Sequence, residues 1–257
     1  LRRIFGKDED AMAANLVGAR MGSRIDRAWY AGKRVLDAGC GRGVIARVLA
    51  RRYPQARIDA IDQDAAVQAR NAALNLAIGT DNCHFATRDL TELEAVDAYD
   101  LVVSIDNLEH IEDDRSVLER IFRALRAGGR LVVHVPHYYR RWPVFGWHVN
   151  FDVPGHVRPG YHMPEIVERV RQAGFVVADS AFSYGFLENM ANNASYWITA
   201  AEERNRLIYA LCFPLLNFVA WLGRSAQPEM GAGVWVVASK PVKAETPATN
   251  VAADEPA

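Results

Sequence analysis

The chain has few cysteines and almost no excess charge, and these two shortages exclude several classes of protein. Its 257 residues include three cysteines, Cys40, Cys83 and Cys212, which are too few and too scattered for a disulfide framework or a cysteine zinc site. This usage predicts a reducing, cytoplasmic location. Thirty basic residues against 31 acidic ones leave a formal charge of −1, which gives no support to a general nucleic-acid binder.

Long apolar runs are also scarce, and a single segment raises the question of a membrane. Residues 207–223, LIYALCFPLLNFVAWLG, carry no charged side chain over 17 residues. A span needs about 20 residues, and Pro214 and Asn217 interrupt this run. We expect a helix buried on most of its surface, in the core or at a dimer interface. A helix that lies in a membrane surface is the second interpretation, and a true span is the third.

Strand patterns alternate with helical patterns from residue 34 to residue 136. The expected strands are 34–37, 56–62, 83–89, 99–107 and 130–136. The expected helices are 43–52, 64–78 and 114–129, the last one stopped by Gly128 and Gly129. This rhythm predicts an α/β fold, a parallel sheet with helices on both faces.

The alternation breaks after Pro136. We expect an irregular loop at 137–162, then a helix at 164–173 and a strand at 174–184. A helical insertion is expected at 186–226 and a last strand at 233–241. With half of its residues apolar, the chain is long enough for one full domain, 1–241, which begins with a helical cap at 1–32. Residues 242–257, VKAETPATNVAADEPA, are expected to be a disordered tail.

The stretch VLDAGCGRGVIARVL, residues 35–49, runs from an apolar strand into three glycines. Glycine is used where a backbone needs a positive φ or a ligand must come close, so this turn is built to receive something. Dinucleotide-binding oxidoreductases use G-x-G-x-x-G, whereas Gly39, Gly41 and Gly43 form G-x-G-x-G. Asp37 directly before them would repel a pyrophosphate but could face the cationic end of a ligand. A nicotinamide-dependent oxidoreductase is therefore disfavoured.

Five segments resemble, in order, the motifs of the class I S-adenosylmethionine-dependent methyltransferases. They are VLDAGCGRG, IDAIDQD, FATRDLTEL, YDLVVSIDNLEHIED and LRAGGRLVVHVP. The resemblance covers residues 35–178 and the last strand. It implies a Rossmann-like seven-stranded sheet in the order 3-2-1-4-5-7-6, with strand seven antiparallel. It also implies S-adenosylmethionine as the cofactor and S-adenosylhomocysteine as the product.

The same resemblance assigns the cofactor-binding residues. Asp37 and the three glycines would hold the methionine part, Asp62 the ribose hydroxyls, and Asp89 with Leu90 the adenine. Ile105 and Asp106 would form the floor near the sulfonium. Cys40 and Gln63 complete the set. Taken singly, an aspartate at such a position can be a helix N-cap, and we expect that role for Asp64 and Asp113.

A hydroxyl acceptor would need a base or a metal, and candidates occur in two places. The expected catalytic residues are Asp106 and His110 after the fourth strand, with His137 and His156 from the loop; His148 and His162 lie in the same loop. Asp106, Glu109 and His110 resemble the E-x-x-E-H metal motif of ubiquinone-biosynthesis and small-RNA methyltransferases, which His156 could complete. Because aspartate at 106 has a shorter reach, a divalent metal is not favoured, and structural or acceptor-lining roles are.

The loop GHVRPGY with MPEIVERVRQAGF resembles type 11 methyltransferases of small-molecule, lipid and glycan pathways. In that loop Arg158 either clamps an acidic group of the acceptor or ties the loop to the sheet. The interpretation is methyl transfer in line to oxygen of a small or lipid-linked metabolite, with peripheral membrane contact through 207–223 as an option. The alternatives are a nucleic-acid or N-methyltransferase, or a protein that binds S-adenosylmethionine without catalysis.

Overall fold

The structure is a computed structural model, and it describes residues 31–142, 146–149, 155–191, 194, 206–223 and 228–242. Nearly all of the expected N-terminal cap, and the expected tail beyond Val242, lie outside these residues. The side chain of His148 also lies outside them.

One seven-stranded sheet forms the centre of the molecule, with the strand order β3-β2-β1-β4-β5-β9-β8. The strands are β1 (Arg34–Ala38), β2 (Arg57–Asp62), β3 (Cys83–Thr87), β4 (Tyr99–Ile105), β5 (Leu125–Pro136), β8 (Val176–Ser183) and β9 (Gly233–Ser239). Pairs among β1 to β5 are parallel, and β9 runs antiparallel to both of its neighbours. The predicted order and the reversed last strand are confirmed.

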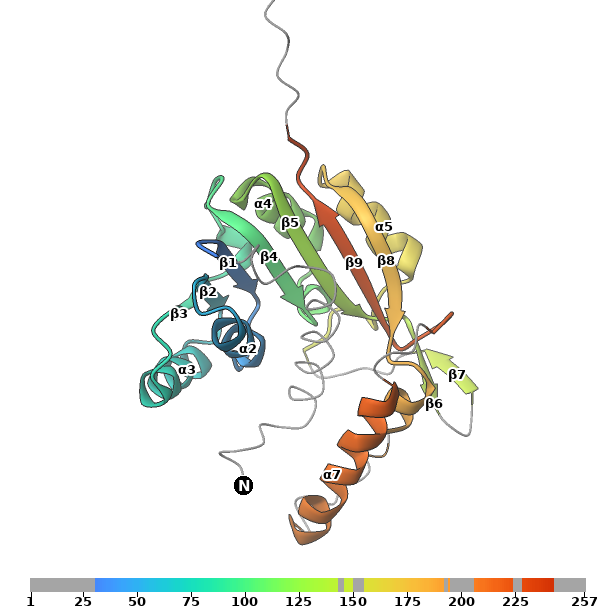
Figure 1. The fold of residues 1–257 in the computed structure, drawn as a ribbon. Coiled ribbons are helices and arrows are strands. Elements are labelled where there is room, and N and C mark those ends of the chain that lie inside the picture. The colour runs from blue at the N-terminus through green and yellow to red at the C-terminus, as the bar shows by residue number, and fades with distance from the viewer. Residues whose placement is uncertain are drawn as a thin grey trace, which may run out of the picture.

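Helices cover both faces of this sheet (Figure 1). They are α2 (Val44–Arg52), α3 (Ala65–Ile78), α4 (Asp114–Ala124) and α5 (Met163–Gln172). Side chains alternate between the faces of a strand, so each face buries its own set. Leu49 of α2 shares one buried cluster with Ile58, whereas Ile121 and Ile166 of α4 and α5 share the other with Leu131.

The fourth helix ends earlier than its sequence predicts. Helix α4 stops at Ala124, and Leu125 already pairs with Tyr99 in the sheet, so the prediction of a helix that continues up to Gly128 is wrong. The Gly128 amide donates to the Lys240 carbonyl at 2.9 Å, and the Lys240 amide donates to the Gly129 carbonyl at 2.9 Å. Sheet hydrogen bonds to a distant segment therefore outcompete the local helical pattern.

The loop expected at 137–162 contains a small hairpin. Strands β6 (Tyr139–Trp142) and β7 (Gly146–Val149) pair antiparallel, so this part is more regular than predicted. His137 forms an isolated bridge with Tyr161, which leads into α5. The hairpin lies at the end of the sheet where β4 and β5 end (Figure 1).

Helix α7 (Arg206–Gly223) projects beyond the same end of the sheet (Figure 1). Ala220 packs with Ala191, and Leu216 and Val219 join that small cluster. The opposite stripe is exposed, with Leu211 at 69% and Leu215 at 64% exposure. Of the two expected positions for this helix, burial in the core is therefore wrong, and a dimer interface stays a prediction. Among the described residues no helix is long and apolar enough to cross a membrane.

Candidate functional site

The turn between β1 and α2 has close contacts that leave no room for a side chain at its first and last glycines, Gly39 and Gly43. Gly39, Gly41 and Gly43 all have positive φ angles. A Cβ at Gly39 would lie 2.1 Å from Cγ of Asn107, and a Cβ at Gly43 would lie 2.3 Å from the Phe85 ring. The turn thus packs against Asn107, which follows β4, and against Phe85 of β3. The sequence pattern alone did not show these contacts.

Asp37 is the buried acid of this turn. Its side chain is 1% exposed, and its Oδ2 atom has no hydrogen-bond partner within the described part of the chain. Burial, with a smaller contribution from the nearby Asp62 charge, raises the pKa of Asp37 to about 7, although the Ala46 amide opposes this. An uncompensated buried carboxyl is costly, so a cationic or hydrogen-bonding ligand group would stabilise it.

Asp62 closes the turn from the neighbouring strand. The Gly41 amide donates to Asp62 Oδ2 at 2.9 Å, and the Asp64 amide donates to Oδ1 at 3.1 Å. Asp62 ends β2 and is half-buried, whereas Gln63 is exposed. Each carboxylate oxygen keeps a second lone pair, so the group is held in place and can still accept from a diol.

The remaining expected cofactor residues end the adjacent strands. Asp89 is exposed and accepts from the Thr91 amide at 2.8 Å, so it caps the short helix η2 (Leu90–Glu92). Leu90 is buried. Cys40 is buried near Gln68, and burial raises the pKa of its thiol above its usual value. Ile105 ends β4. Because β3, β2, β1 and β4 are adjacent and parallel, these residues share one edge.

The predicted N-cap roles of Asp64 and Asp113 are confirmed. The Val67 amide donates to Asp64 Oδ1 at 3.0 Å, and the Ser116 amide donates to Asp113 Oδ1 at 3.1 Å. Both aspartates therefore satisfy otherwise open amides at the first turns of α3 and α4.

Three of the four residues of the expected metal motif gather after β4. Ligand atoms of Glu109, His110 and His156 all lie within 4.8 Å of one another. Glu109 and His110 belong to the short helix η3 (Leu108–His110), and the Val157 amide donates to the Glu109 carbonyl at 2.9 Å. The His110 and His156 rings meet edge to face at 4.5 Å. The fold thus brings the loop residue His156 beside the segment that follows β4. The spacing of these residues in the sequence does not establish this contact.

The fourth residue, Asp106, points to a different partner. Its Oδ1 atom lies 2.6 Å from Nδ1 of His134 on β5. Glu109 is 1% exposed, and burial raises its pKa well above the usual range, with the Asp106 charge adding to the effect. Burial, and then the neighbouring His110, lowers the pKa of His156. A neutral carboxyl and two imidazoles can donate and accept hydrogen bonds, whereas a metal would need Glu109 to ionise.

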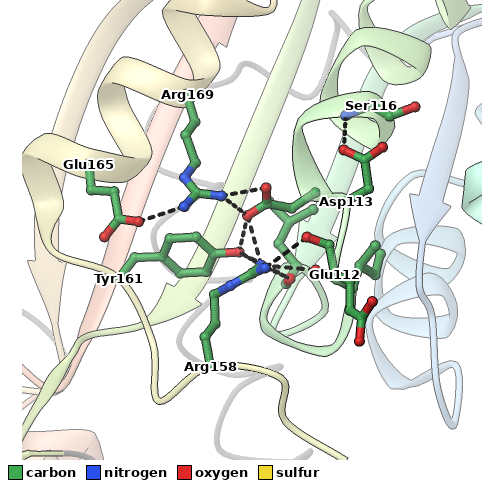
Figure 2. A network of polar contacts seen from close by, with 10 residues as sticks. Glu112, Asp113, Ser116, Arg158, Tyr161, Glu165 and Arg169 are labelled. Atoms are coloured by element: carbon green, nitrogen blue, oxygen red, sulfur yellow. Dashed lines mark hydrogen bonds and ion pairs between the residues drawn. The ribbon is translucent and has the colours of Figure 1, made fainter.

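Arg158 ties its loop to the body of the protein. Its Nη1 atom donates to the carbonyls of Leu108 and Ile111 at 3.0 and 2.9 Å, and lies 2.8 Å from Asp114 Oδ2. Figure 2 shows Arg158 and Arg169 converging with the Tyr161 hydroxyl on this network. The guanidinium is occupied by the protein itself, so of the two expected roles the tie is confirmed. The contacts give no separate support to a clamp on an acidic group of the acceptor, which stays a prediction.

His137 lies in an aromatic group of its own. It is buried, and its ring neighbours are His162, Tyr139 and Phe182, with ring centroids 6.0, 5.7 and 5.1 Å away. Burial, and then the His162 charge, lowers the pKa of His137, so its ring is held neutral. The described structure brings His137 into contact with these rings rather than with the Glu109 group.

Sequence reasoning missed His134 and Ser183: His134 on β5 contacts Asp106 at the end of β4, and Ser183 at the end of β8 contacts His134. His134 Nε2 lies 2.7 Å from Ser183 Oγ, and both side chains are buried. The available signal was the single polar side chain inside the apolar run LVVHV of β5. A polar group in a central strand needs a buried partner, and this strand position lies directly beside Ile105.

The sheet with its reversed β9 is the one built by the class I S-adenosylmethionine-dependent methyltransferases, and the chain has this fold. Residues 35–129 match the family model described as "Methyltransferase domain".

Two curated relatives match about two fifths of the chain. Trans-aconitate 2-methyltransferase of Deinococcus radiodurans is 37% identical over 103 residues, which are 40% of this chain and 38% of that protein. Ubiquinone biosynthesis O-methyltransferase of Pseudomonas savastanoi pv. phaseolicola is 32% identical over 108 residues, 41% of this chain and 45% of that protein. The chain thus matches less than half the length of these relatives.

Solved structures extend the likeness over most of the chain. The cyclase SpnF superposes with a TM-score of 0.61 at 22% identity, covering 91% of this chain and 81% of that one. Coclaurine N-methyltransferase bound to N-methylheliamine and SAH gives a TM-score of 0.62 at 17% identity, covering 89% and 71%. Identities this low show a shared fold, and one of the two proteins is named for a different reaction.

Proposed function

We propose that this protein transfers a methyl group from S-adenosylmethionine to an oxygen atom of a small or lipid-linked acceptor. The observation that carries the cofactor part is the unpartnered Oδ2 atom of Asp37, buried beside the Gly39–Gly43 turn. A carboxyl in that position is matched to an ammonium group, such as the one at the amino-acid end of this cofactor. The methyltransferase domain match over residues 35–129 supports the same cofactor.

The other strand-end residues fit the rest of the cofactor. Asp62 is held by two backbone amides, so its orientation toward a ribose diol requires no rearrangement. Leu90 offers a buried apolar surface to a flat base, and Asp89 beside it offers a carboxylate. The bound sulfonium supplies an already activated methyl group, so the protein has to align the acceptor and exclude water.

Asp106 is the residue that we assign to the acceptor. It follows β4 directly, and its side chain is 41% exposed even though one oxygen is engaged by His134. A carboxylate oxygen that faces solvent at this edge can take the proton of a hydroxyl acceptor. His110 and His156 stand nearby as hydrogen-bonding groups, and His137 lies in the neighbouring aromatic group. One of the curated relatives is itself named an O-methyltransferase.

The test of the cofactor is isothermal titration with S-adenosylhomocysteine. We expect micromolar binding by the wild type and binding at least tenfold weaker by Asp62→Ala. Asp64→Ala is the matched control, because it removes the same charge two residues away and costs only the α3 cap. Absence of heat with a folded wild-type protein, or equal losses in both variants, would contradict the cofactor assignment.

The test of the reaction is S-adenosylhomocysteine release with a panel of acceptors. The panel contains catechols, hydroxybenzoates, aliphatic alcohols, dicarboxylic acids, primary and secondary amines, and RNA, each with and without EDTA. We expect oxygen acceptors to be methylated and EDTA to leave the rate unchanged. Turnover of amines or RNA alone would favour the alternative transferases, and binding without any turnover would favour a non-catalytic protein.

The hydrophobic character of the acceptor is suggested by α7. Leu211, Leu215, Phe218 and Leu222 follow one another at intervals of four, three and four residues, so they share one face of the helix. All four are more than half exposed. A protein that draws a lipid-linked acceptor from a membrane surface would present such a stripe beside its site.

A further inference from the structure

Three side chains form a continuous hydrogen-bonded row beside the proposed acceptor position. Asp106 Oδ1 lies 2.6 Å from His134 Nδ1, and His134 Nε2 lies 2.7 Å from Ser183 Oγ. Asp106 follows β4, His134 lies in β5 and Ser183 ends β8. The row therefore crosses the sheet from its partly exposed end at Asp106 to a fully buried end at Ser183.

The sheet is locally built to allow this row. Strand β9 separates β5 from β8, and its first residue, Gly233, lies opposite Ser183. A Cβ at Gly233 would lie 2.4 Å from Ser183 Oγ and 2.5 Å from His134 Nε2. Any other residue at 233 would therefore push the two side chains apart. The direct bond across an intervening strand exists because that strand has no side chain at this point.

The backbone at the exposed end is strained in a way that fixes Asp106. Its φ is +47°, a left-handed conformation that residues other than glycine rarely adopt. The Asp106 amide donates to the carbonyl of His134 at 2.9 Å, so main chain and side chain are both bound to the same residue. Tyr184, directly after Ser183, also has a positive φ of 56°. Strain of this kind persists where surrounding contacts hold the chain in one conformation.

The donors and acceptors of the row have one consistent order. A carboxylate accepts only, so Nδ1 of His134 carries a hydrogen and donates to Asp106. In the neutral ring, Nε2 is then an acceptor, and the Ser183 hydroxyl donates to it. The Asp106 carboxylate thereby selects the Nδ1–H tautomer of His134, the Ser183 hydroxyl satisfies Nε2 and holds the ring, and the ring in turn holds the orientation of Asp106.

We infer that His134 and Ser183 are positioning residues for methyl transfer, which hold Asp106 as the base that accepts the acceptor's proton. The inference rests on the proposed function. In the step, the acceptor oxygen forms a bond to the methyl carbon while the carbon–sulfur bond breaks and its electron pair stays on sulfur. The hydroxyl proton passes to the Asp106 oxygen that does not face His134 and leaves from there to solvent. His134 and Ser183 keep their protons throughout.

A first test needs no acceptor. Histidine side chains labelled with ¹⁵N report their tautomer by NMR, and His134→Asn identifies the signal of His134. We expect the Nδ1–H tautomer in the wild type, with an imidazole proton that exchanges slowly because the ring is buried. Asp106→Asn is expected to lose the single tautomer, because an amide can donate as well as accept, and Ser183→Ala is expected to shift the Nε2 resonance. An Nε2–H tautomer in the wild type, or a ring unaffected by both variants, would overturn the inference.

A second test compares two amides at position 134. The side-chain nitrogen of asparagine can replace Nδ1 and donate to Asp106, whereas that of glutamine replaces Nε2 and reaches Ser183. With any oxygen acceptor that the panel identifies, we expect His134→Gln to lower kcat by about 10- to 100-fold, and His134→Asn to keep most of it. The KM for S-adenosylmethionine and the affinity for S-adenosylhomocysteine are expected to stay unchanged in both.

The two amides have similar polarity and each leaves one partner unsatisfied, so a purely structural role would affect both variants alike. Equal values of kcat in the two variants, or a change in cofactor affinity that matches the change in kcat, would overturn the inference while the proposed function stands. Failure of the wild type to bind S-adenosylhomocysteine would instead overturn the proposed function, and the NMR result would still decide whether the row exists.

Discussion

The guanidinium of Arg158 lies 2.8 Å from the carboxylate of Asp114, and this ion pair fixes residues 155–161 against the start of α4. Arg169 pairs with the same carboxylate, and the Tyr161 hydroxyl donates to it at 2.6 Å. The neighbouring Glu112 carbonyl accepts from Arg158 Nη2 at 2.9 Å. The contact therefore determines where His156 stands relative to Glu109.

Asp114→Asn is expected to lower the free energy of unfolding by about 3 kcal/mol. The Asp114 carboxylate is buried, and without its charge Arg158 and Arg169 would lose their shared counter-ion. Denaturant unfolding monitored by circular dichroism measures the difference. Asp113→Asn serves as the control, since asparagine can replace aspartate as the cap of α4. Equal stability of the two variants would show that the network of Figure 2 contributes little.

Gly39→Ala and Gly41→Ala should differ, although both glycines have positive φ angles. At Gly41 a Cβ has nothing within 4 Å, so alanine costs only the backbone strain of about 1–2 kcal/mol. At Gly39 the same methyl group meets Asn107, and overpacking adds about 1–3 kcal/mol. Thermal unfolding of both variants gives the comparison. Adding Asn107→Ala to Gly39→Ala should recover part of the loss, and no recovery would contradict the contact.

The ligand-free protein should lose stability as the pH rises from about 4 to about 7. The pKa of Asp37 is 3.8 in the unfolded chain and about 7 in the folded protein, so between these values the folded state holds a proton that the unfolded state has released. The contribution is fully present below pH 4 and lost above pH 7, at no more than about 1.4 kcal/mol per pH unit.

Asp37→Asn isolates this effect, because the amide has the same shape and does not titrate. The difference in unfolding free energy between the wild type and the variant should change with pH in that window, with the variant more stable above pH 7. The variant should bind S-adenosylhomocysteine more weakly at every pH above 7, where the wild-type carboxylate is charged. A difference independent of pH would contradict the raised pKa of Asp37.

The exposed face of α7 should mediate contact with lipid. We expect the wild type to sediment with phosphatidylcholine vesicles, and Leu215→Glu combined with Phe218→Glu to stay in the supernatant. Leu76→Glu is the control, because Leu76 on α3 is also exposed, at 86%, and lies on a different helix. Equal sedimentation of all three proteins would assign the stripe to another partner, and chromatography of the same variants would show whether that partner is a second copy.

The sheet could be predicted from the sequence because its signals are local. Each parallel strand is a short apolar run, and glycines or aspartates mark the ends of β1 and β2, so the site edge follows from the strand order. The end of α4 could not be predicted in this way. The pattern from Leu125 onward is compatible with a helix, and the competing hydrogen bonds come from Lys240, more than a hundred residues away.

The hydrogen-bond partners of the site residues could not be predicted from the sequence pattern either. The spacing of Asp106, Glu109 and His110 suggested one group, yet Asp106 turns to His134 because β5 lies beside β4 with His134 in register with Ile105. From the sequence, Arg158 was equally compatible with binding an acidic group and with holding its loop. The structure shows that its guanidinium donates to the carbonyls of Leu108 and Ile111. Side-chain direction depends on contacts between distant segments, which residue types and spacing do not determine.

The position of β9 has a consequence for the order in which the protein can assemble. Residues 233–239 are inserted between β5 and β8, which precede them in the chain, so until that late segment has left the ribosome β8 has no partner strand and β5 is paired on one side only. Residues up to Pro136 can pair β1 through β5 earlier. Pairing at such long range is slow, and it leaves the edges of β5 and β8 open to wrong partners during synthesis. The row from Asp106 to Ser183 therefore forms only when β9 has been inserted. An activity that depends on this row would appear only after all seven strands have paired.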